Sequence, residues 1–303
     1  MSLVIENGNV FRVECETLVQ FSSPKNGRNV VIPHILKSGE KITTLGSRFC
    51  QGEYNKITIS NRIKKIEDSA FANADVKEVC WSSGCRVIPD DCFHGSKIQK
   101  ISNIDNVVEI GLNAFYSSGI RNFTIPPLCK TIGNGCFAYS LLNAAFLDTE
   151  ALSRIGAQAF RNTPVLIEVV WPQNCLTIPD RCFYESNIKT ISNIQNVKEV
   201  GAHAFEDSKI NKMEWPKNCS TIPEYCFWNC GIEELTGLEC VQTIERGAFA
   251  SFSMPGHSFK IDISNSKVSF IGNGAFVGVG RANVIFPYYV LPEMIDSAFG
   301  LFF

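Results

Sequence analysis

The stretch Ile271-Gly272-Asn273-Gly274-Ala275-Phe276 is one copy of a pattern that recurs along the chain: an aliphatic residue, four variable positions and a phenylalanine. We count twelve copies, whose phenylalanines are Phe49, Phe71, Phe93, Phe115, Phe137, Phe160, Phe183, Phe205, Phe227, Phe249, Phe276 and Phe299. Successive copies are 22 or 23 residues apart, except for a gap of 27 before Phe276. A period this steady is typical of a stacked-repeat protein, so every other motif must be judged against it.

Each copy continues into a second apolar pattern that predicts a short strand. Apolar residues recur about five, eight and ten positions after the phenylalanine, as Ile210, Met213 and Trp215 do after Phe205. The last two alternate with a polar residue, here Glu214, which is the periodicity of a strand. One unit cannot bury its own apolar residues, whereas stacked units form a continuous core with the phenylalanine rings in one file. The sequence therefore predicts a β-rich solenoid of about twelve coils of 22–23 residues, with a parallel sheet on one face.

The pattern resembles that of leucine-rich repeats. The box of an aliphatic residue, Gly, two variable residues, Ala and Phe is similar to that of the BspA-like subclass, also called the TpLRR type, of bacteria and of parasitic protists such as trichomonads. Matching boxes are residues 110–115, 155–160 and 200–205, and the resemblance covers roughly residues 30–303. It implies a right-handed superhelix, commonly on the cell surface, that binds other proteins or a host matrix; it implies no enzymatic activity.

The period also divides the chain. Residues 1–29 stand outside it, and the Asn7-Gly8 turn between the apolar segments 3–5 and 10–13 predicts a β-hairpin that caps the first coil. Residues 30–303 are predicted to form the repeat solenoid, with an insertion near residues 250–260 where the spacing grows. No polar cap follows Phe299, which leaves end-to-end or edge self-association at the C-terminus open.

Successive coils alternate in type over most of the array. Cys or Ala stands directly before the phenylalanine in turn, and Trp171 to Cys175 closely matches Trp215 to Cys219. The alternation makes a super-repeat of about 45 residues, for which duplication of a two-coil unit is the simplest cause. Large and small residues can then interleave between neighbouring coils.

Charge and hydropathy exclude several classes of function. The formal net charge is −2, so no overall attraction to nucleic acid or to an anionic membrane is expected. No stretch approaches the ~18 apolar residues of a membrane span, and residues 1–6 lack the pattern of a secretory signal peptide. The resemblance favours the cell surface, and the missing signal favours the cytoplasm.

Eight of the 13 cysteines occupy fixed positions of the repeat. Four stand directly before a phenylalanine and four stand seven residues earlier; they are Cys92, Cys136, Cys182, Cys226, Cys85, Cys129, Cys175 and Cys219. Ala or an aliphatic residue takes these positions in other copies. The pattern predicts free thiols that behave as small core residues, with scattered disulfides or a metal site as the alternatives.

No constellation of residues predicts catalysis, a metal site or a cofactor site. The four histidines are far apart and lack metal-ligand spacing. The segment 272–278 lacks the spacing of a phosphate-binding loop, and its first glycine is expected to serve the repeat by adopting a positive φ. We therefore expect a protein that is not an enzyme and that binds no metal and no cofactor.

Three tryptophans, Trp81, Trp171 and Trp215, hold equivalent positions at strand ends. An exposed aromatic ladder can stack on sugars, which is one interpretation. Ile125 fills the same position in another copy, which favours an inward position in the core.

The strand face is the predicted partner-binding surface. One outward residue is expected in each strand: Thr58, Cys80, Ser102, Thr124, Phe146, Val170, Ser192, Glu214 and Thr236, with the registration slipping by one near Ser102, Val170 and Ser192. Arg121 and Lys212 are among the neighbouring outward positions. Phe146 and Val170 are adjacent apolar residues in a polar row, which is the usual form of an interface hot spot; the alternative is that Phe146 turns inward.

The candidate partner-binding residues are Thr124, Phe146, Val170, Ser192, Glu214, Arg121 and Lys212. The predicted function is a non-enzymatic protein-binding module, namely a cell-surface antigen or adhesin with a protein or matrix partner. The competing prediction is an intracellular scaffolding protein with the same fold.

Overall fold

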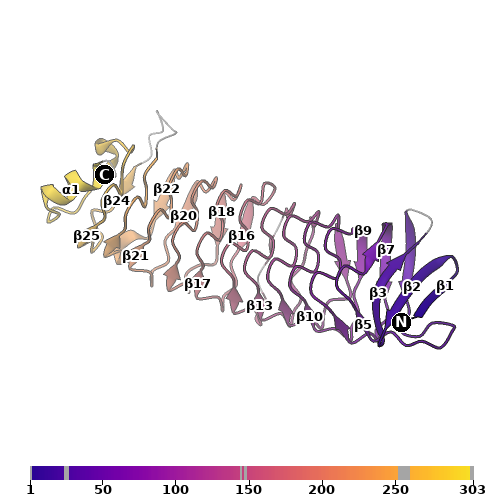
Figure 1. The fold of residues 1–303 in the computed structure, drawn as a ribbon. Helices are drawn as coiled ribbons and strands as arrows, with labels where there is room; N and C mark the ends of the chain where they lie inside the picture. The colour runs from indigo at the N-terminus through magenta and orange to yellow at the C-terminus, as the bar shows by residue number, and fades with distance from the viewer. Residues whose placement is uncertain (1, 24–26, 144, 147–148, 252–259, 301–303) are drawn as a thin grey trace. The chain divides into compact units, whose positions relative to one another are not determined.

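The computed structural model describes residues 2–23, 27–143, 145–146, 149–251 and 260–300. For residues 145 and 146 it describes the backbone and not the side chains. The chain forms two compact units, residues 1–144 and 145–303. In each unit, successive coils place short strands side by side in parallel. The predicted fold is confirmed: the protein is a β-solenoid of about 11 turns with parallel sheets and little helix (Figure 1).

The first unit combines an antiparallel start with parallel stacks. Its strands are β1 (Ser2–Glu6), β2 (Asn9–Glu14), β3 (Thr17–Ser22), β4 (Arg28–Ile32), β5 (Thr44–Leu45), β6 (Cys50–Gln51), β7 (Glu53–Ile59), β8 (Lys65–Ile66), β9 (Asp75–Cys80), β10 (Val87–Ile88), β11 (Lys100–Ser102), β12 (Glu109–Ile110) and β13 (Thr131–Ile132). The order β4-β7-β9-β11 forms the parallel sheet of the strand face, and β10, β12 and β13 pair in parallel in a second stack.

The predicted hairpin opens the chain. β1 pairs antiparallel with β2, and Asn7 (φ 49°) and Gly8 (φ 78°) form the turn in the left-handed conformation that tight hairpin turns require. β3 pairs antiparallel with β2 and parallel with β5 and β6, so it joins the hairpin to the first coil. Phe11 and Phe21 are buried beneath these strands. The assignment of residues 1–29 as a separate cap stays a prediction.

The second unit has shorter strands and a final helix. Its elements are β14 (Ala145–Phe146), β15 (Arg154–Ile155), β16 (Glu168–Val170), β17 (Thr177–Ile178), β18 (Thr190–Ser192), β19 (Glu199–Val200), β20 (Lys212–Glu214), β21 (Thr221–Ile222), β22 (Glu234–Thr236), η1 (Leu238–Cys240), β23 (Thr243–Ile244), β24 (Ile261–Asp262), β25 (Phe270–Ile271), η2 (Arg281–Asn283), β26 (Val284–Ile285) and α1 (Pro292–Phe299). The order β14-β16-β18-β20-β22 forms its strand face. In this unit β16, β18, β20 and β22 lie along one side, and β17, β21 and β25 lie along the other (Figure 1).

The predicted file of phenylalanine rings is present inside each unit. From Phe71 to Phe137 the ring centroids are 5.1–5.3 Å apart, with planes inclined by 15° or less. From Phe160 to Phe276 the centroids are 5.4–5.5 Å apart, with planes inclined by 4–11°. Stacking at this spacing places each ring in contact with the next coil, so the file links the coils of a unit into one core.

The three tryptophans belong to the core, as the inward alternative predicts. Trp81, Trp171 and Trp215 are 0–1% exposed. Their Nε1–H groups donate to the backbone oxygens of Cys85, Cys175 and Cys219, at 3.2, 3.1 and 2.9 Å respectively. Since their ring faces are covered, these side chains are not available for stacking on sugars.

At two of the three tryptophans, Trp81 and Trp171, the next coil supports the tryptophan-bearing strand through an asparagine. Nδ2 of Asn103 donates to the backbone oxygen of Trp81, and Nδ2 of Asn193 donates to that of Trp171, both at 2.7 Å. The two coil types recognised in the sequence therefore contribute different groups to the contact between them. One contributes the large ring, and the other contributes the amide that satisfies its carbonyl.

The eight cysteines of the repeat are buried, as predicted, and each is a free thiol. Burial raises the pKa of Cys85 to about 11 and that of Cys175 to about 12, because the low-polarity core disfavours the thiolate. These side chains thus act as small apolar groups that fill the interior.

The glycine after the aliphatic residue does not have the predicted positive φ. A Cβ atom at Gly201 would lie 2.3 Å from Oδ1 of Asp180 and 2.4 Å from its backbone nitrogen, and Gly111 approaches Asp90 in the same way. Glycine is needed here because the neighbouring coil leaves no room for a side chain. The left-handed backbone lies two residues before the phenylalanine, for example at His203 (φ 59°).

The last copy of the pattern forms α1 rather than a plain coil. Phe299 ends this helix, and its ring is 5.6 Å from that of Phe276 with the planes inclined by 30°. The backbone N–H of Phe276 donates to the carbonyl of Ala298 at 2.8 Å, so α1 continues the bonding between coils. The predicted insertion near residues 250–260 falls largely on residues 252–259, outside the described part of the chain.

Candidate binding surface

The strand face of the second unit alternates between buried and outward residues. Val169, Ile191, Met213 and Leu235 are the middle residues of β16, β18, β20 and β22, and all are at most 8% exposed. The residues on either side of them point outward, because successive side chains of a strand lie on opposite faces. In-register pairing, such as Lys212 with Glu234 and Glu214 with Thr236, arranges the outward side chains in rows across the strands.

Five of the seven predicted binding residues lie on this sheet. Ser192, Lys212 and Glu214 are exposed, and Val170 is half-buried. The backbone of Phe146 pairs with that of Val170. The side chain of Phe146 lies outside the described residues, so its outward position stays a prediction.

The slip in registration expected near Ser102, Val170 and Ser192 does not interrupt the pairing of the strands. Val170 pairs with Ser192 in one continuous row, and Ser102 pairs with Cys80. A shift of one residue would turn a buried side chain such as Val169 toward solvent, which holds the register in place. The extra residue of the 23-residue copies is therefore accommodated outside the strands.

Arg121 and Thr124 belong to the first unit, so the structure does not bring them onto the same sheet as the other five. Both are exposed and lie outside the strands of that unit. The strand face of the first unit has its own outward row, in which Thr58 pairs with Cys80 and Cys80 pairs with Ser102.

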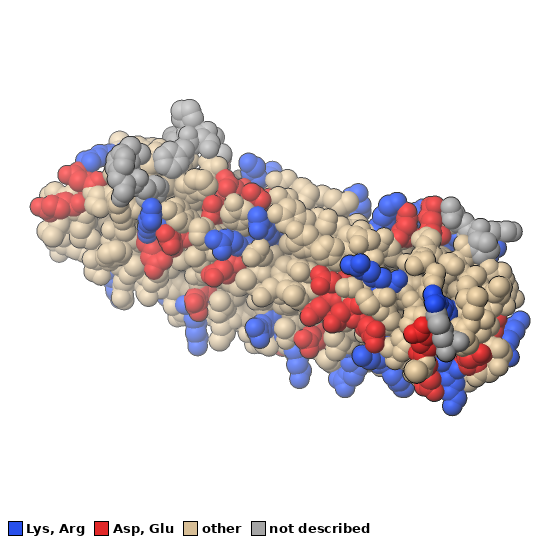
Figure 2. Space-filling model, in the orientation of Figure 1, with Lys and Arg blue, Asp and Glu red and all other residues tan. Residues whose placement is uncertain are grey.

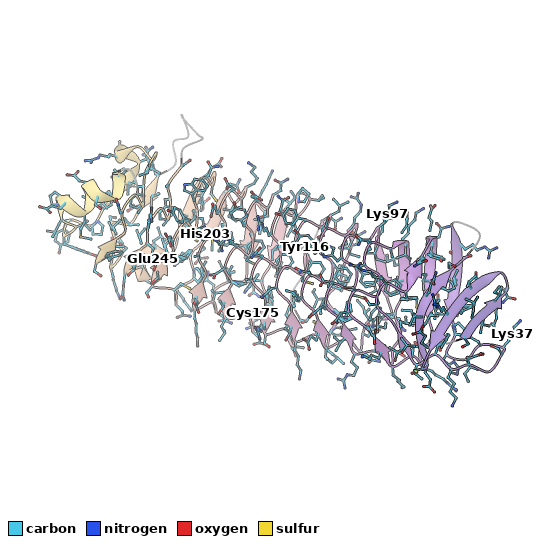
Figure 3. All side chains as sticks on the ribbon, in the orientation of Figure 1. Lys37, Lys97, Tyr116, Cys175, His203 and Glu245 are labelled. Carbon is cyan, nitrogen blue, oxygen red and sulfur yellow. The ribbon has the colours of Figure 1, made fainter. Side chains whose placement is uncertain are left out.

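The strand face of the first unit is rich in basic side chains. Nζ of Lys56 lies 2.9 Å from Oε1 of Glu78, and Lys97 pairs with Asp75 (Figure 3 labels Lys97). Lys77, Lys100 and Arg121 are exposed on the same coils. This face therefore presents ammonium and guanidinium groups beyond those in the two ion pairs. Over the side in view, acidic and basic side chains are interspersed (Figure 2).

The strand face of the second unit has more exposed carboxylates than ammonium groups. The carboxylates lie at Glu168, Glu214, Glu233 and Glu234, and the ammonium groups at Lys189, Lys209 and Lys212. Lys212 and Glu234 form an ion pair of 2.8 Å with both side chains more than half exposed. An exposed pair of this kind contributes at most about 1 kcal/mol to stability. These charges therefore bear mainly on which partner can approach.

Ile167 adds an apolar residue that the sequence analysis missed. It precedes β16 and is 44% exposed. Backbone hydrogen bonds place it in one column with Lys189, Asn211 and Glu233. An aliphatic residue in a column otherwise filled by Lys, Asn and Glu was the available signal. Together with the half-buried Val170, it makes one end of this sheet apolar, beside an acidic remainder.

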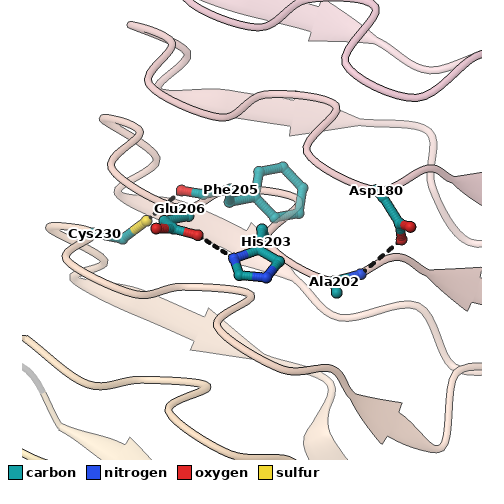
Figure 4. Close-up of polar contacts among 6 residues, drawn as sticks. All are labelled: Asp180, Ala202, His203, Phe205, Glu206 and Cys230. Atoms are coloured by element: carbon teal, nitrogen blue, oxygen red, sulfur yellow. Dashed lines mark hydrogen bonds and ion pairs between the residues drawn. The ribbon is translucent and has the colours of Figure 1, made fainter. Parts of the chain in front are cut away.

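The turn before β20 holds a buried acid next to a histidine (Figure 4). Glu206 is 8% exposed and is hydrogen-bonded to Nδ1 of His203. Burial raises the pKa of the Glu206 carboxyl, and the hydrogen bond to His203 opposes that change in part. Cys230 Sγ donates to the backbone oxygen of Phe205 at 2.6 Å, and Oδ1 of Asp180 accepts from the N–H of Ala202 at 2.9 Å. The last two contacts join neighbouring coils, which is a structural role.

Among the described residues, neither a metal site nor a membrane-spanning helix is found. They contain no group of three or more His, Cys, Asp or Glu side chains placed to hold a metal ion. They also contain no helix with the length and hydropathy needed to cross a bilayer.

Comparisons with known proteins agree with the repeat and the fold. The family model for the BspA type leucine rich repeat region, in six copies, matches residues 20–143 and 141–255. A leucine-rich repeat protein from Bacteroides ovatus has a similar structure, with a TM-score of 0.61 and 18% identity over 94% of this chain and 88% of that one. A leucine rich cell surface protein from Faecalibacterium prausnitzii aligns with a TM-score of 0.46 and 15% identity, over 99% of this chain and 93% of that one. No curated protein matches the sequence significantly.

Proposed function

The chain belongs to the BspA-type leucine-rich repeat family, and on that premise we propose that it is a non-enzymatic protein-binding module. Repeat folds of this kind offer long, rigid surfaces for partners. The finer proposal is a cell-surface antigen or adhesin that presents its strand face to a protein or matrix partner. The observation that carries it is the outward face of β16, β18, β20 and β22, where apolar side chains stand among polar ones.

The distribution of apolar groups on that sheet supports an anchor at one end. Ile167 lies directly before β16 and Val170 is the last residue of that strand, and the predicted anchor Phe146 belongs to the adjacent strand. Outward polar residues such as Ser192 and Lys212 follow on the next strands. Interface hot spots have this form, in which a few apolar anchors are surrounded by a polar rim that excludes water.

A binding experiment tests the proposal. The intact chain is used to capture partners from surface extracts and from lysates, and the affinity of each captured partner is then measured. The double variant Ile167→Ser, Val170→Ser and the single variant Phe146→Ser should each weaken binding at least tenfold. Binding that survives both, and is lost on changing residues 254–257, would move the interface to that segment.

A matched control separates a local anchor from general surface hydrophobicity. Leu176 is 42% exposed on the opposite stack of the same unit, directly before β17. Leu176→Ser should leave the affinity unchanged. Equal losses from Leu176→Ser and from the Ile167, Val170 variant would contradict a binding site on the strand face.

The second candidate function is an intracellular scaffold, and the free thiols favour it. All 13 cysteines are unpaired in the structure, and reduced cysteines are typical of proteins in reducing compartments. Fluorescence microscopy of the tagged chain, with and without permeabilisation, distinguishes the two locations. Staining of intact cells supports the surface role, and staining only after permeabilisation supports the scaffold.

A further inference from the structure

The strands opposite the strand face, here called the second stack, pair in separate groups. In the first unit β5 pairs with β8, and β10, β12 and β13 form another group. In the second unit β17 pairs with β19, and β21, β23 and β25 form another group. Among the described strands the second stack is therefore interrupted before β10, β17 and β21, whereas the strands of each strand face pair continuously.

Each interruption falls at a coil with a proline directly after its strand, namely Pro89, Pro179 or Pro223. In other coils the residue at this position donates its backbone N–H to the preceding coil, as Gly201 does to the carbonyl of Ile178 at 2.7 Å. Proline has no N–H to donate. The carbonyl groups that lose this donor are those of Ile66, Ile155 and Val200.

A second backbone bond is missing at the same three coils. In other coils the residue before the strand donates its N–H to the preceding coil, as Lys198 does to Leu176 and Gln242 does to Ser220, both at 2.8 Å. In the proline coils the N–H groups at this position donate to no backbone oxygen of the described residues; they belong to Arg86, Leu176 and Ser220. The proline coils thus lack both bonds with which the second stack joins one coil to the coil before it.

A weaker contact bridges each of these gaps. The thiols of Cys85, Cys175 and Cys219 donate to backbone oxygens of the preceding coil, with 3.4–3.6 Å between sulfur and oxygen. Hydrogen bonds from sulfur are weak. The gap between β15 and β17 also holds an open depression of about 360 Å³, lined by Arg154 of one coil and Thr177 of the next. The second stack is therefore held least firmly at the proline coils.

The same coils remain bonded on their other sides. The backbone N–H of Phe160 donates to Cys182 at 3.0 Å, and that of Phe205 donates to Cys226 at 3.0 Å. On the strand face β16, β18 and β20 pair in sequence. Because parts of a protein with few hydrogen bonds open most readily, movement between these coils should be confined to the second stack.

We propose that the three proline coils are flexible joints, at which the second stack opens and closes while the strand face stays paired. Opening a gap tilts one coil against the preceding coil about the paired strands, as in a hinge. A strand face that bends in this way can follow the contour of a partner. That consequence rests on the proposed function, whereas the joints themselves do not.

Pulsed electron paramagnetic resonance on the full chain measures the opening. Spin labels at Arg154→Cys and Phe270→Cys span two of the gaps and five coil spacings, or about 24 Å. The three accessible native thiols are replaced by serine to prevent other labelling; they are Cys15, Cys80 and Cys240. A flexible second stack should give a broad distribution of distances between the two labels.

Restoring the missing donors should narrow that distribution. In the labelled chain, the double variant Pro179→Gly, Pro223→Gly supplies both N–H groups and should reduce the width at least about twofold. The matched control Pro172→Gly, Pro216→Gly changes the prolines that follow the tryptophans of the same coils, and it should leave the width unchanged. An unchanged width in the first variant, or equal narrowing in both, overturns the proposal.

Amide hydrogen exchange of the unmodified chain tests the gaps without any substitution. The N–H groups of Leu176 and Ser220 should exchange at least about tenfold faster than those of Lys198 and Gln242, which hold the equivalent positions in bonded coils. Equal protection of the two pairs would show that the second stack is closed in solution, and it would also overturn the proposal.

Discussion

In the first unit the strand face presents Lys77, Lys100 and Arg121, whereas the sheet of the second unit presents more carboxylates than ammonium groups and has an apolar end at Ile167. Beneath these faces the two interiors are alike: stacked phenylalanines, buried tryptophans and free thiols at the same positions of the repeat. The repeat therefore constrains what lies inside each coil and leaves the outward residues free to differ. Information about partners should be sought in the outward residues.

The largest expected effect tests whether the two interiors are equivalent. Phe93 and Phe205 are both fully buried and stacked between two rings of their files. Phe93→Ala and Phe205→Ala should each lower the free energy of unfolding by about 3–5 kcal/mol, because each leaves a cavity in the core. Thermal unfolding followed by circular dichroism measures the loss. A variant that keeps the wild-type melting temperature would show that its unit has a different core.

A smaller effect is expected at the close approaches between coils. Gly111→Ala in the first unit and Gly201→Ala in the second should each cost about 1–3 kcal/mol, because the new Cβ would overlap the preceding coil. Gly119→Ala is the control, since its Cβ would lie 3.1 Å from the carbonyl oxygen of Ile98, and it should cost less. Chemical denaturation gives the three values. A loss at Gly119 as large as at Gly201 would contradict a contact specific to the box.

The smallest effect concerns a histidine–carboxylate pair that is present in both units. The histidine comes first in the sequence in the second unit, and the carboxylate comes first in the first unit. Glu206 follows its phenylalanine and pairs with His203. Because burial raises the pKa of Glu206, the stability that this group contributes is present at low pH and is lost as the pH rises above the ordinary glutamate value of about 4.3. Asp207, which also raises the pKa, and Arg181, which lowers it, complete the charged surroundings. Glu206→Gln should therefore gain stability relative to wild type as the pH rises.

The matched variant is Asp91→Asn in the first unit. There the histidine is His94, which follows its phenylalanine, and the two side chains are 39% and 37% exposed with 3.2 Å between Nδ1 and Oδ1. Because solvent screens an exposed pair, Asp91→Asn should change the melting temperature by less than Glu206→Gln does. A larger shift for Asp91→Asn than for Glu206→Gln would reverse the comparison.

Inward residues could be predicted from the sequence because burial imposes a period. The file containing Phe160, the inward Trp171 and the core thiol of Cys175 all follow from their spacing and all lie inside. The box glycine was predicted for the wrong reason. Its role at Gly201 depends on how closely the preceding coil approaches, and that distance is a property of the stacked coils instead of the local sequence.

The rest of the candidate site depends on contacts that a period does not encode. Ile167 precedes its strand, so alternation within the strand gave no reason to place it outward. Helix α1 lacks a side-chain cap at Leu291, and only its packing against the last phenylalanines distinguishes it from another coil. Registration near Val170 depends on pairing with both neighbouring strands.

The contact between a tryptophan-bearing coil and the asparagine of the next coil has a consequence for how such a gene can change length. Loss of the single coil that holds Asn193, by unequal recombination, would place the coils of Trp171 and Trp215 side by side, without the amide that satisfies the carbonyl of Trp171. Gain or loss of two coils keeps every neighbour as it was. The heritable unit of this array is therefore the pair, and its alternating section should lengthen or shorten by even numbers of coils.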